Sequence, residues 1–263
     1  MKEQLRIAIG QLKIIDGDKE ANLRKMQQAL HEAHTLHADL LILPELCVTG
    51  MLAPDEFNAL AEPREGETFR RIQHMLERYP VHLLYSFPEL GSEKDYYITT
   101  CLVDDKGVPL AYYRKTHLFS EEAVAFSKGN SFTACDLFGV KVGLLTCYDI
   151  EFPEPARELA LNGTQLLIVN SANMTPYEMT HRVFITARAM ENQIFVVYCN
   201  RIGSNSTYDY HGQSAVVAPD GKMLLEFEDD VEAVKCVDIS LSHIHASQQV
   251  FHYLRDRRAE LYR

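Results

Sequence analysis

The hydrophobic and polar positions follow two periods along the chain. Residues 5–9 place apolar side chains at every second position, which is typical of a strand with one buried face. In residues 18–33 the apolar positions recur at spacings of three and four, which predicts an amphipathic helix. Residues 40–43 are apolar throughout and predict a strand that is buried on both faces.

The two patterns alternate as far as residue 237 and predict an α/β chain with a mixed sheet or two sheets. Helices are expected at residues 67–79, 154–162 and 178–191. Single strands are expected at residues 81–85, 140–146, 165–170, 194–199 and 234–237. Asp105-Lys106-Gly107 and Pro219-Asp220-Gly221 are turn sequences, and they predict hairpins that join residues 97–103 to 108–113 and 213–218 to 223–228.

Composition and charge narrow the possible classes of protein. No linker rich in glycine, serine or proline divides the 263 residues, so we expect one domain at residues 1–242, with a less regular tail at 243–263. The net charge of −11 argues against a nucleic-acid partner or an anionic membrane surface, because phosphate groups would be repelled. No apolar run approaches the roughly 20 residues of a membrane-spanning helix.

The cysteine pattern and the N-terminus indicate a cytoplasmic protein. Six cysteines are widely spaced and form no CxxC pair, so neither a zinc ribbon nor a thioredoxin-type motif is predicted. The start of the chain does not look like a signal peptide. We therefore expect free thiols in a reducing compartment, and we expect no metal.

Three predicted strands are each followed closely by a reactive side chain: Glu45, Lys115 and Cys147. Ligand sites in α/β folds lie beyond the carboxyl ends of strands, so the three side chains are candidates for one site. A thiol needs a base or a nearby cation to become a nucleophile at neutral pH. Glu45 could take its proton, while Lys115 and the backbone N–H of Tyr148 could stabilise an oxyanion. Taken singly, a cysteine is more often a small buried apolar residue, a lysine is more often a surface charge, and Glu45 could cap a following helix.

The sequences around these residues carry further motifs. Leu43-Pro44-Glu45-Leu46 surrounds the glutamate, Tyr113-Arg114-Lys115-Thr116-His117-Leu118-Phe119 surrounds the lysine, and Cys147-Tyr148-Asp149 leads to Phe152-Pro153-Glu154. With these motifs in this order, the chain resembles the nitrilase (carbon–nitrogen hydrolase) superfamily over roughly residues 5–240.

The resemblance implies a four-layer α-β-β-α sandwich and a catalytic triad. Glu45 would be the base, Lys115 the oxyanion stabiliser and Cys147 the nucleophile in hydrolysis of an amide C–N bond through a thioester. The family has a second glutamate before a Phe-x-x-Gly sequence, which is residues 126–129 here; Glu122 fits best and Glu121 is its competitor. No metal or organic cofactor is expected. Family members commonly form homodimers or higher oligomers in which the C-terminal tail takes part.

The substrate is less well specified than the reaction. The segment from Cys147 to Glu154 resembles bacterial aliphatic amidases, including the 5-aminopentanamidase type, which favours a small aliphatic amide. Tyr148, Glu151 and Asn173 are the candidate substrate-binding residues; Glu151 could attract a substrate ammonium, pair with Arg157 or face solvent. The alternatives are an ω-amidase, an N-carbamoylputrescine-type amidase, a nitrilase, or a binding or scaffold protein without activity.

Overall fold

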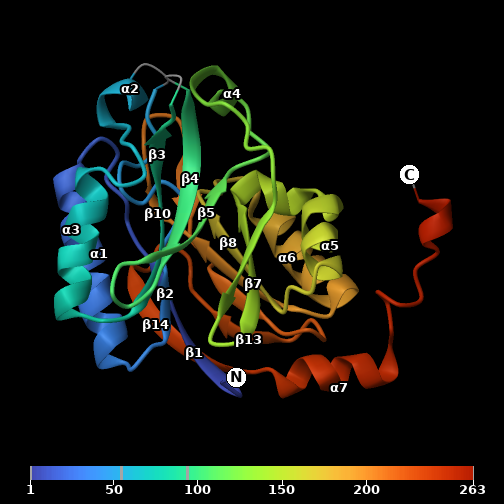
Figure 1. The fold of residues 1–263 in the computed structure, drawn as a ribbon. Coiled ribbons are helices and arrows are strands. Elements are labelled where there is room, and N and C mark those ends of the chain that lie inside the picture. Colours follow the sequence, from blue (N-terminus) through green and yellow to red (C-terminus); the bar gives the residue numbers. More distant parts are fainter. Residues whose placement is uncertain (1, 54–55, 93–94, 263) are drawn as a thin grey trace.

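The computed structural model describes residues 2–53, 56–92 and 95–262, and in these ranges two six-stranded sheets face each other (Figure 1). In the first sheet the strand order is β14-β1-β2-β3-β4-β5. Its strands are β1 (Gln4–Gln11), β2 (Leu40–Ile42), β3 (His82–Leu90), β4 (Tyr96–Val103), β5 (Pro109–Arg114) and β14 (Ala233–Ser240). β1, β2 and β3 are parallel, and β4 and β5 form the predicted hairpin at one edge.

The second sheet has the order β13-β12-β9-β8-β7-β6. Its strands are β6 (Thr133–Leu137), β7 (Val140–Thr146), β8 (Leu166–Ser171), β9 (Phe195–Asn200), β12 (Ala215–Val217) and β13 (Met223–Glu226). The three central strands β7, β8 and β9 are parallel, and all of β8 and β9 is buried. This burial on both faces explains why these strands read as continuous apolar runs.

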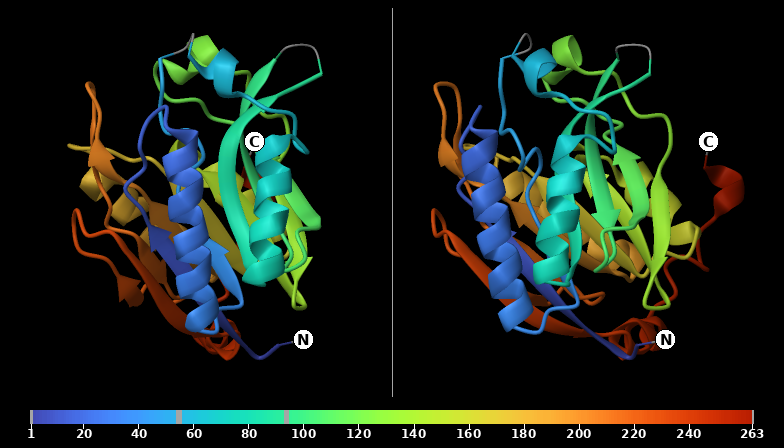
Figure 2. Two further views of the ribbon diagram at one scale, coloured as in Figure 1. Left: turned by 90° about the vertical axis from the view of Figure 1, so that its left-hand side faces the viewer. Right: turned by 60° about the vertical axis from the view of Figure 1, so that its left-hand side comes forward.

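Two pairs of helices form the outer layers (Figures 1 and 2). They are α1 (Lys19–Thr35) and α3 (Glu67–Arg78) on the first sheet, and α5 (Pro153–Leu161) and α6 (Glu178–Asn192) on the second. The apolar stripe predicted for α1 is buried, and the Asp18 side chain accepts a hydrogen bond from the Ala21 N–H at the helix N-terminus. The four-layer α-β-β-α sandwich expected from the sequence is therefore confirmed.

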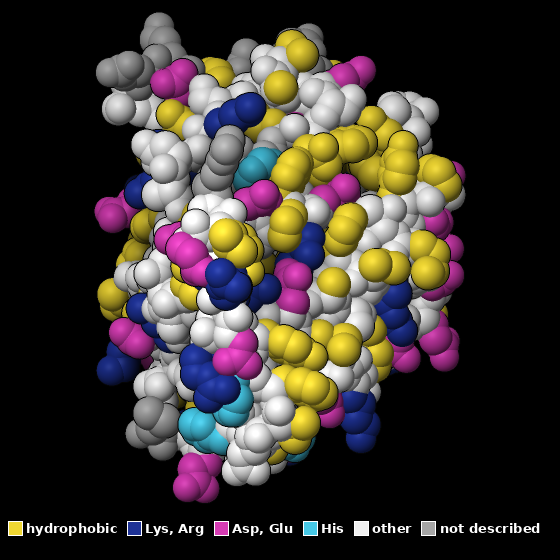
Figure 3. All heavy atoms as spheres, turned by 90° about the vertical axis from the view of Figure 1, so that its right-hand side faces the viewer, with side chains coloured by type: hydrophobic (Ala, Val, Ile, Leu, Met, Phe, Trp, Pro, Cys, Tyr) yellow, Lys and Arg dark blue, Asp and Glu magenta, His cyan; other side chains and the backbone are white. Residues whose placement is uncertain are grey.

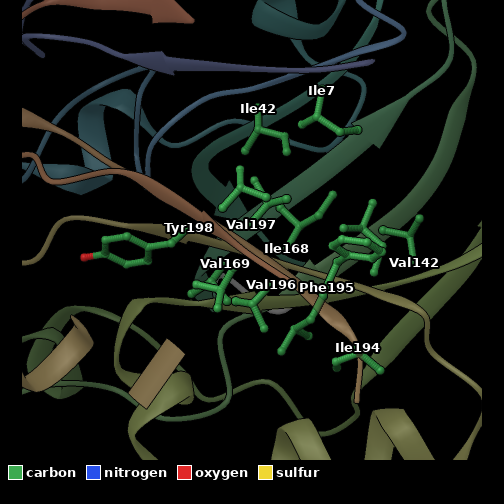
Figure 4. Packing of buried hydrophobic residues seen from close by; sticks show 14 of the residues in the cluster. Ile7, Ile42, Val142, Ile168, Val169, Ile194, Phe195, Val196, Val197 and Tyr198 are labelled. Atoms are coloured by element: carbon green, nitrogen blue, oxygen red, sulfur yellow. The ribbon is translucent and has the colours of Figure 1, made fainter. Parts of the chain in front are cut away.

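The main core lies between the two sheets (Figure 4). Ile7 and Ile42 extend from the first sheet toward Ile168 and Val197 of the second, and all four side chains are at most 1% exposed. Burial of an aliphatic side chain of this size contributes about 1.5–3 kcal/mol. Because this packing fixes one sheet against the other, the strand ends of both sheets are held at fixed positions along one edge.

The sequence did not predict every element. It missed strand β6, the hairpin of β10 (Ile202–Ser204) and β11 (Asp209–His211), and two short helices, α2 (Phe57–Leu60) and α4 (Glu122–Ala125). The two helices and the β10–β11 hairpin are too short to show a clear period, and β6 buries only Leu137, so it has no apolar face to reveal it.

The tail also differs from the expectation. It was predicted to be less regular, but it starts with a nine-residue helix, α7 (Ser242–Val250), and continues through a short 3-10 turn, η2 (Ala259–Leu261), away from the sandwich (Figure 1). Only Ile244 of α7 is buried, so the helix has no strong apolar stripe to reveal it. Arg263, the last residue of the tail, lies outside the described residues. None of the described helices has the length and apolar sequence needed to cross a bilayer.

Candidate active site

The three reactive side chains that the sequence singled out lie at neighbouring strand ends. Glu45 follows β2, Lys115 directly follows β5, and Cys147 directly follows β7. Lys115 Nζ lies 2.8 Å from Glu45 Oε1 and 2.8 Å from each carboxylate oxygen of Glu122. The side chains of Lys115 and Glu45 are completely buried. A single ammonium therefore bridges two carboxylates in the interior.

Neighbouring backbone groups hold both carboxylates in place. Glu45 Oε2 accepts a hydrogen bond of 3.0 Å from the Ala172 N–H, just beyond β8. Glu122 Oε2 accepts one of 2.7 Å from the Phe119 N–H. Glu121 is exposed, so of the two candidates it is Glu122 that contacts Lys115.

The nucleophile candidate lies in a strained turn. Cys147 has a φ of 49°, a conformation that non-glycine residues rarely adopt, and it begins a 3-10 helix, η1 (Cys147–Glu151). Asp149 and Thr146 stabilise this turn by bonding each other's backbone N–H groups. Asp149 also accepts a hydrogen bond from the Tyr113 hydroxyl and lies 2.8 Å from His117 Nδ1. His117 thus has a structural contact with the turn.

The electrostatics of the cluster differ from group to group. Burial lowers the pKa of Lys115, but the charges of Glu122 and Glu45 outweigh it, so that this pKa is raised well above its ordinary value. Burial raises the pKa of Glu122 to about 7, against the opposing effect of Lys115. Burial also raises the pKa of Cys147; the negative charges of Glu45 and Glu122 add to the rise and Lys115 opposes it. The resting sulfur is therefore a thiol, and it must lose its proton when it attacks.

A pocket of about 700 Å³ opens in front of Cys147. Cys147 and Glu122 reach its wall, whereas Glu45 and Lys115 lie behind it. The three candidate substrate-binding residues Tyr148, Glu151 and Asn173 all line this pocket. The structure thus places every predicted site residue in or directly behind one cavity.

Two of these residues have partners that the sequence did not reveal. Glu151 Oε1 lies 3.3 Å from His181 Nε2 and not beside Arg157, whose guanidinium contacts Glu191 instead. The option of a Glu151–Arg157 pair was therefore wrong. The Asn173 side chain donates a hydrogen bond to the Tyr177 carbonyl.

The sequence did not reveal a cluster of buried polar side chains behind the nucleophile. Ser171, Tyr198 and His181 come from β8, β9 and α6, and each is at most 2% exposed. The Ser171 hydroxyl lies close enough to Cys147 to lower the pKa of the thiol, against the larger effect of burial. His181 occupies a buried position in the helical pattern of residues 178–191, so only its tertiary contacts distinguish it from an ordinary packed histidine.

Cys47, the thiol nearest to Glu45 in sequence, lies elsewhere. It packs among apolar residues between the first sheet and its helices, within 3.5 Å of the Ser86 carbonyl oxygen. Burial raises the pKa of Cys47 to about 12, which leaves it protonated and unreactive. Among the residues that the structure describes, no group of three metal-binding side chains is found.

Comparison with known proteins identifies the family of this chain. The model of the carbon-nitrogen hydrolase family matches residues 6–249. The chain therefore belongs to the carbon–nitrogen hydrolase family, and it is an enzyme of the amidase type within the nitrilase superfamily.

Individual relatives match over nearly the whole chain. A protein of Pseudomonas protegens described as "Hydrolase in pqqF 5'region" is 39% identical, over 98% of this chain and 90% of its own length. An (R)-stereoselective amidase of a Pseudomonas species is 37% identical, over 98% and 93%. A mutant of the amidase from Nesterenkonia sp. AN1, solved with acrylamide added to its active-site cysteine, superposes with a TM-score of 0.87 at 31% identity, covering 98% of each chain. A second structure of that amidase holds butyramide, with a TM-score of 0.84 at 30% identity over 98% of this chain and 95% of its own.

Proposed function

We propose that this enzyme hydrolyses the C–N bond of small aliphatic amides to an acid and ammonia through a thioester on Cys147. The observation that carries the proposal is the Glu45–Lys115–Glu122 cluster, with its 2.8 Å contacts, behind the cysteine at the end of the pocket. The butyramide bound by a mutant of the Nesterenkonia amidase supports a short acyl chain.

In the first half of the reaction, Glu45 accepts the thiol proton as the sulfur adds to the amide carbonyl carbon. This order follows from the raised pKa of Cys147, because a buried thiol next to two carboxylates does not ionise in advance. The carbonyl oxygen becomes an oxyanion, which the ammonium of Lys115 and the backbone N–H of Tyr148 stabilise. Collapse of this tetrahedral intermediate breaks the C–N bond, and Glu45 returns the proton to the leaving ammonia.

In the second half, water attacks the thioester carbonyl while Glu45 accepts one of its protons. The second tetrahedral intermediate expels the sulfur, which regains a proton as the carboxylic acid leaves. Glu122 does not exchange protons with the substrate in this scheme. It holds the ammonium of Lys115 in position by accepting its hydrogen bonds with both oxygens.

An ammonia-release assay tests the proposal. Acetamide, butyramide, hexanamide, glutaramate, N-carbamoylputrescine and butyronitrile would be offered to the wild type and to Cys147→Ala. We expect release from the unbranched amides, a covalent acyl adduct on Cys147 by mass spectrometry, and neither from the variant. Preference for glutaramate would support an ω-amidase instead, preference for N-carbamoylputrescine a carbamoyl amidase, and preference for butyronitrile a nitrilase. No release from any compound would support a binding protein.

We also infer that the enzyme pairs with a second copy of itself through the outer face of α6 and the tail. Met179, Val183 and Met190 on α6 are 44–69% exposed, and apolar side chains gather on this side of the molecule (Figure 3). Such a patch is typical of an interface. Val183→Glu should shift the mass measured by light scattering toward that of one chain, whereas the exposed Glu158→Gln on α5 should leave it unchanged.

A further inference from the structure

Glu151 and His181 form a pair in the pocket wall. Glu151 ends the 3-10 helix that Cys147 begins, and His181 comes from the facing helix α6. His181 Nε2 lies 3.3 Å from Glu151 Oε1. The histidine is 2% exposed, whereas the glutamate side chain is 26% exposed. Both residues line the cavity, and the carboxylate is the more accessible of the two.

The other side of the imidazole is also bonded. His181 Nδ1 lies 2.9 Å from the Tyr198 hydroxyl and 3.5 Å from the Ser171 hydroxyl, both in the interior. The backbone carbonyl of Glu151 accepts a 2.9 Å hydrogen bond from Arg188 Nη2. With contacts on both ring nitrogens and on the Glu151 backbone, the carboxylate is held in one position rather than left to rotate. A preorganised acceptor of this kind is what a specificity site requires.

The charge of the pocket decides what this acceptor would bind. Its described lining includes five carboxylates, from Asp16, Glu56, Glu121, Glu122 and Glu151, and no lysine or arginine. Asp16 is bonded to Arg201, Glu122 to Lys115, and Glu56 to a backbone N–H. Glu151 shares one oxygen with a histidine. A donor group on the substrate is attracted to such a wall, whereas a substrate carboxylate is repelled.

We propose that Glu151, held in place by His181, selects amides whose acyl chain ends in a hydrogen-bond donor. This inference rests on the proposed amidase function. A 3-10 helix rises about 2 Å per residue, so the Cα atoms of Cys147 and Glu151 lie roughly 8 Å apart. A substrate that reaches both the Cys147 thiol and the Glu151 carboxylate therefore needs an acyl chain of several carbons. An ammonium is the stronger donor toward a carboxylate, and a hydroxyl is the weaker one. His181 is a positioning residue in this scheme, since it acts through Glu151.

Substrates of matched length separate the effects of a hydrogen-bond donor, of charge and of shape on turnover. 5-Aminopentanamide, 5-hydroxypentanamide and hexanamide differ only in the terminal group, and glutaramate carries a carboxylate. We expect kcat/KM for 5-aminopentanamide to exceed that for hexanamide by about 10- to 100-fold, which is the range of a charge-assisted hydrogen bond. The hydroxy amide should fall between them and glutaramate below them, with the differences mainly in KM.

Variants then test whether the preference for 5-aminopentanamide depends on Glu151 and His181. In Glu151→Gln the kcat/KM ratio of 5-aminopentanamide to hexanamide should fall close to one, and the ratio cancels any general loss of activity. His181→Phe keeps a ring but loses both hydrogen bonds, so the ratio should fall as well. His181→Gln can still donate to Glu151 and should restore part of it. Glu154→Gln removes the same charge from an exposed position outside the pocket lining and should leave the ratio as in the wild type.

The outcomes distinguish this inference from the proposed function. Equal turnover of hexanamide and 5-aminopentanamide by the wild type would overturn the inference but leave the amidase intact. If neither amide is hydrolysed, the proposed function fails, and calorimetric binding of both amides to Cys147→Ala tests the selectivity separately. Tighter binding of the ammonium compound there, lost on addition of Glu151→Gln, would support the pair. Equal binding would contradict it, as would an unchanged ratio in His181→Phe.

Discussion

Two clusters of carboxylates and cations lie on the two sides of the end of β5: the Lys115 cluster is buried, whereas the arginines of the Glu89 cluster are 31–40% exposed. At the end of β5, the ammonium of Lys115 is shared by Glu45 and Glu122. The residue before it, Arg114, contacts Glu89 on β3, and Glu89 also binds Arg64 and the Thr99 hydroxyl. Adjacent residues of a strand face opposite sides, which separates the clusters.

The balance of charge distinguishes them. Two carboxylates share one cation in the Lys115 cluster, and the pKa of Glu122 rises to about 7 because of burial. Two cations surround one carboxylate in the Glu89 cluster; burial alone would raise the pKa of Glu89, but Arg114, Thr99 and Arg64 together lower it. In the first cluster, burial makes Glu122 costly to keep charged. In the second cluster, Glu89 is fully hydrogen-bonded by Arg114, Arg64 and Thr99, and it stabilises the fold. A buried ion pair is therefore weak evidence of function by itself, and it is the excess of carboxylates directly behind Cys147 that distinguishes the Lys115 cluster.

The largest effect is expected at the nucleophile. Cys147→Ala removes the atom that forms the thioester, so kcat should fall by on the order of 10⁶, as when the nucleophile of a hydrolase is deleted. Circular dichroism and the oligomeric mass should stay as in the wild type. Ammonia release at the wild-type rate from this variant would rule out the mechanism.

Lys115→Ala should be the next most severe. Loss of an oxyanion donor costs about 3–4 kcal/mol, or roughly 10²–10³ in kcat. The variant also leaves two buried carboxylates without their counter-ion, which should lower the free energy of unfolding by about 3–5 kcal/mol. Adding Glu122→Gln should recover part of that stability, measured by urea unfolding, but not the activity. A near-normal kcat/KM in Lys115→Ala would show that the ammonium is not at the oxyanion.

Glutamine substitutions compare the two clusters directly. Glu122→Gln should lower kcat by about 10- to 100-fold, because Lys115 loses a charged hydrogen bond that positions it. Glu89→Gln should leave kcat near the wild-type value and lower the free energy of unfolding by about 1.5–3 kcal/mol, since two guanidinium groups lose their carboxylate. A large loss of kcat in Glu89→Gln, together with a near-normal kcat in Glu122→Gln, would contradict the comparison.

The last prediction concerns the pH dependence of stability and leaves the catalytic rate aside. The pKa of Glu122 is raised from 4.5 to about 7, so its contribution to stability is present below pH 4.5 and is lost as the pH rises through about 7. The pKa of Glu89 is lowered, so its contribution is present above pH 4.5 and is lost as the pH falls. Urea unfolding across this pH range should show wild type losing stability relative to Glu122→Gln with rising pH, and relative to Glu89→Gln with falling pH. Parallel curves would mean that neither carboxylate changes its pKa on folding.

Local patterns predicted most of the fold, and tertiary contacts account for the misses. Helices α1, α3, α5 and α6 lie where the three- and four-residue spacing placed them, because their apolar stripes pack on the sheets. α4 has only four residues and shows no such period, yet it carries Glu122 to the ammonium of Lys115. The tail helix α7 buries one side chain and was missed for the same reason.

The chain by itself determined the chemistry: a thiol, a carboxylate and an ammonium, each placed just after an apolar strand. Short apolar runs of this kind form buried strands, so the ends of the strands could be located from the local pattern alone. Only the tertiary structure decided the partners: Glu122 rather than Glu121 on Lys115, and His181 rather than Arg157 on Glu151. Those pairs join residues of separate elements, and the packing of the two sheets and of α6 sets their distances, which no local period encodes.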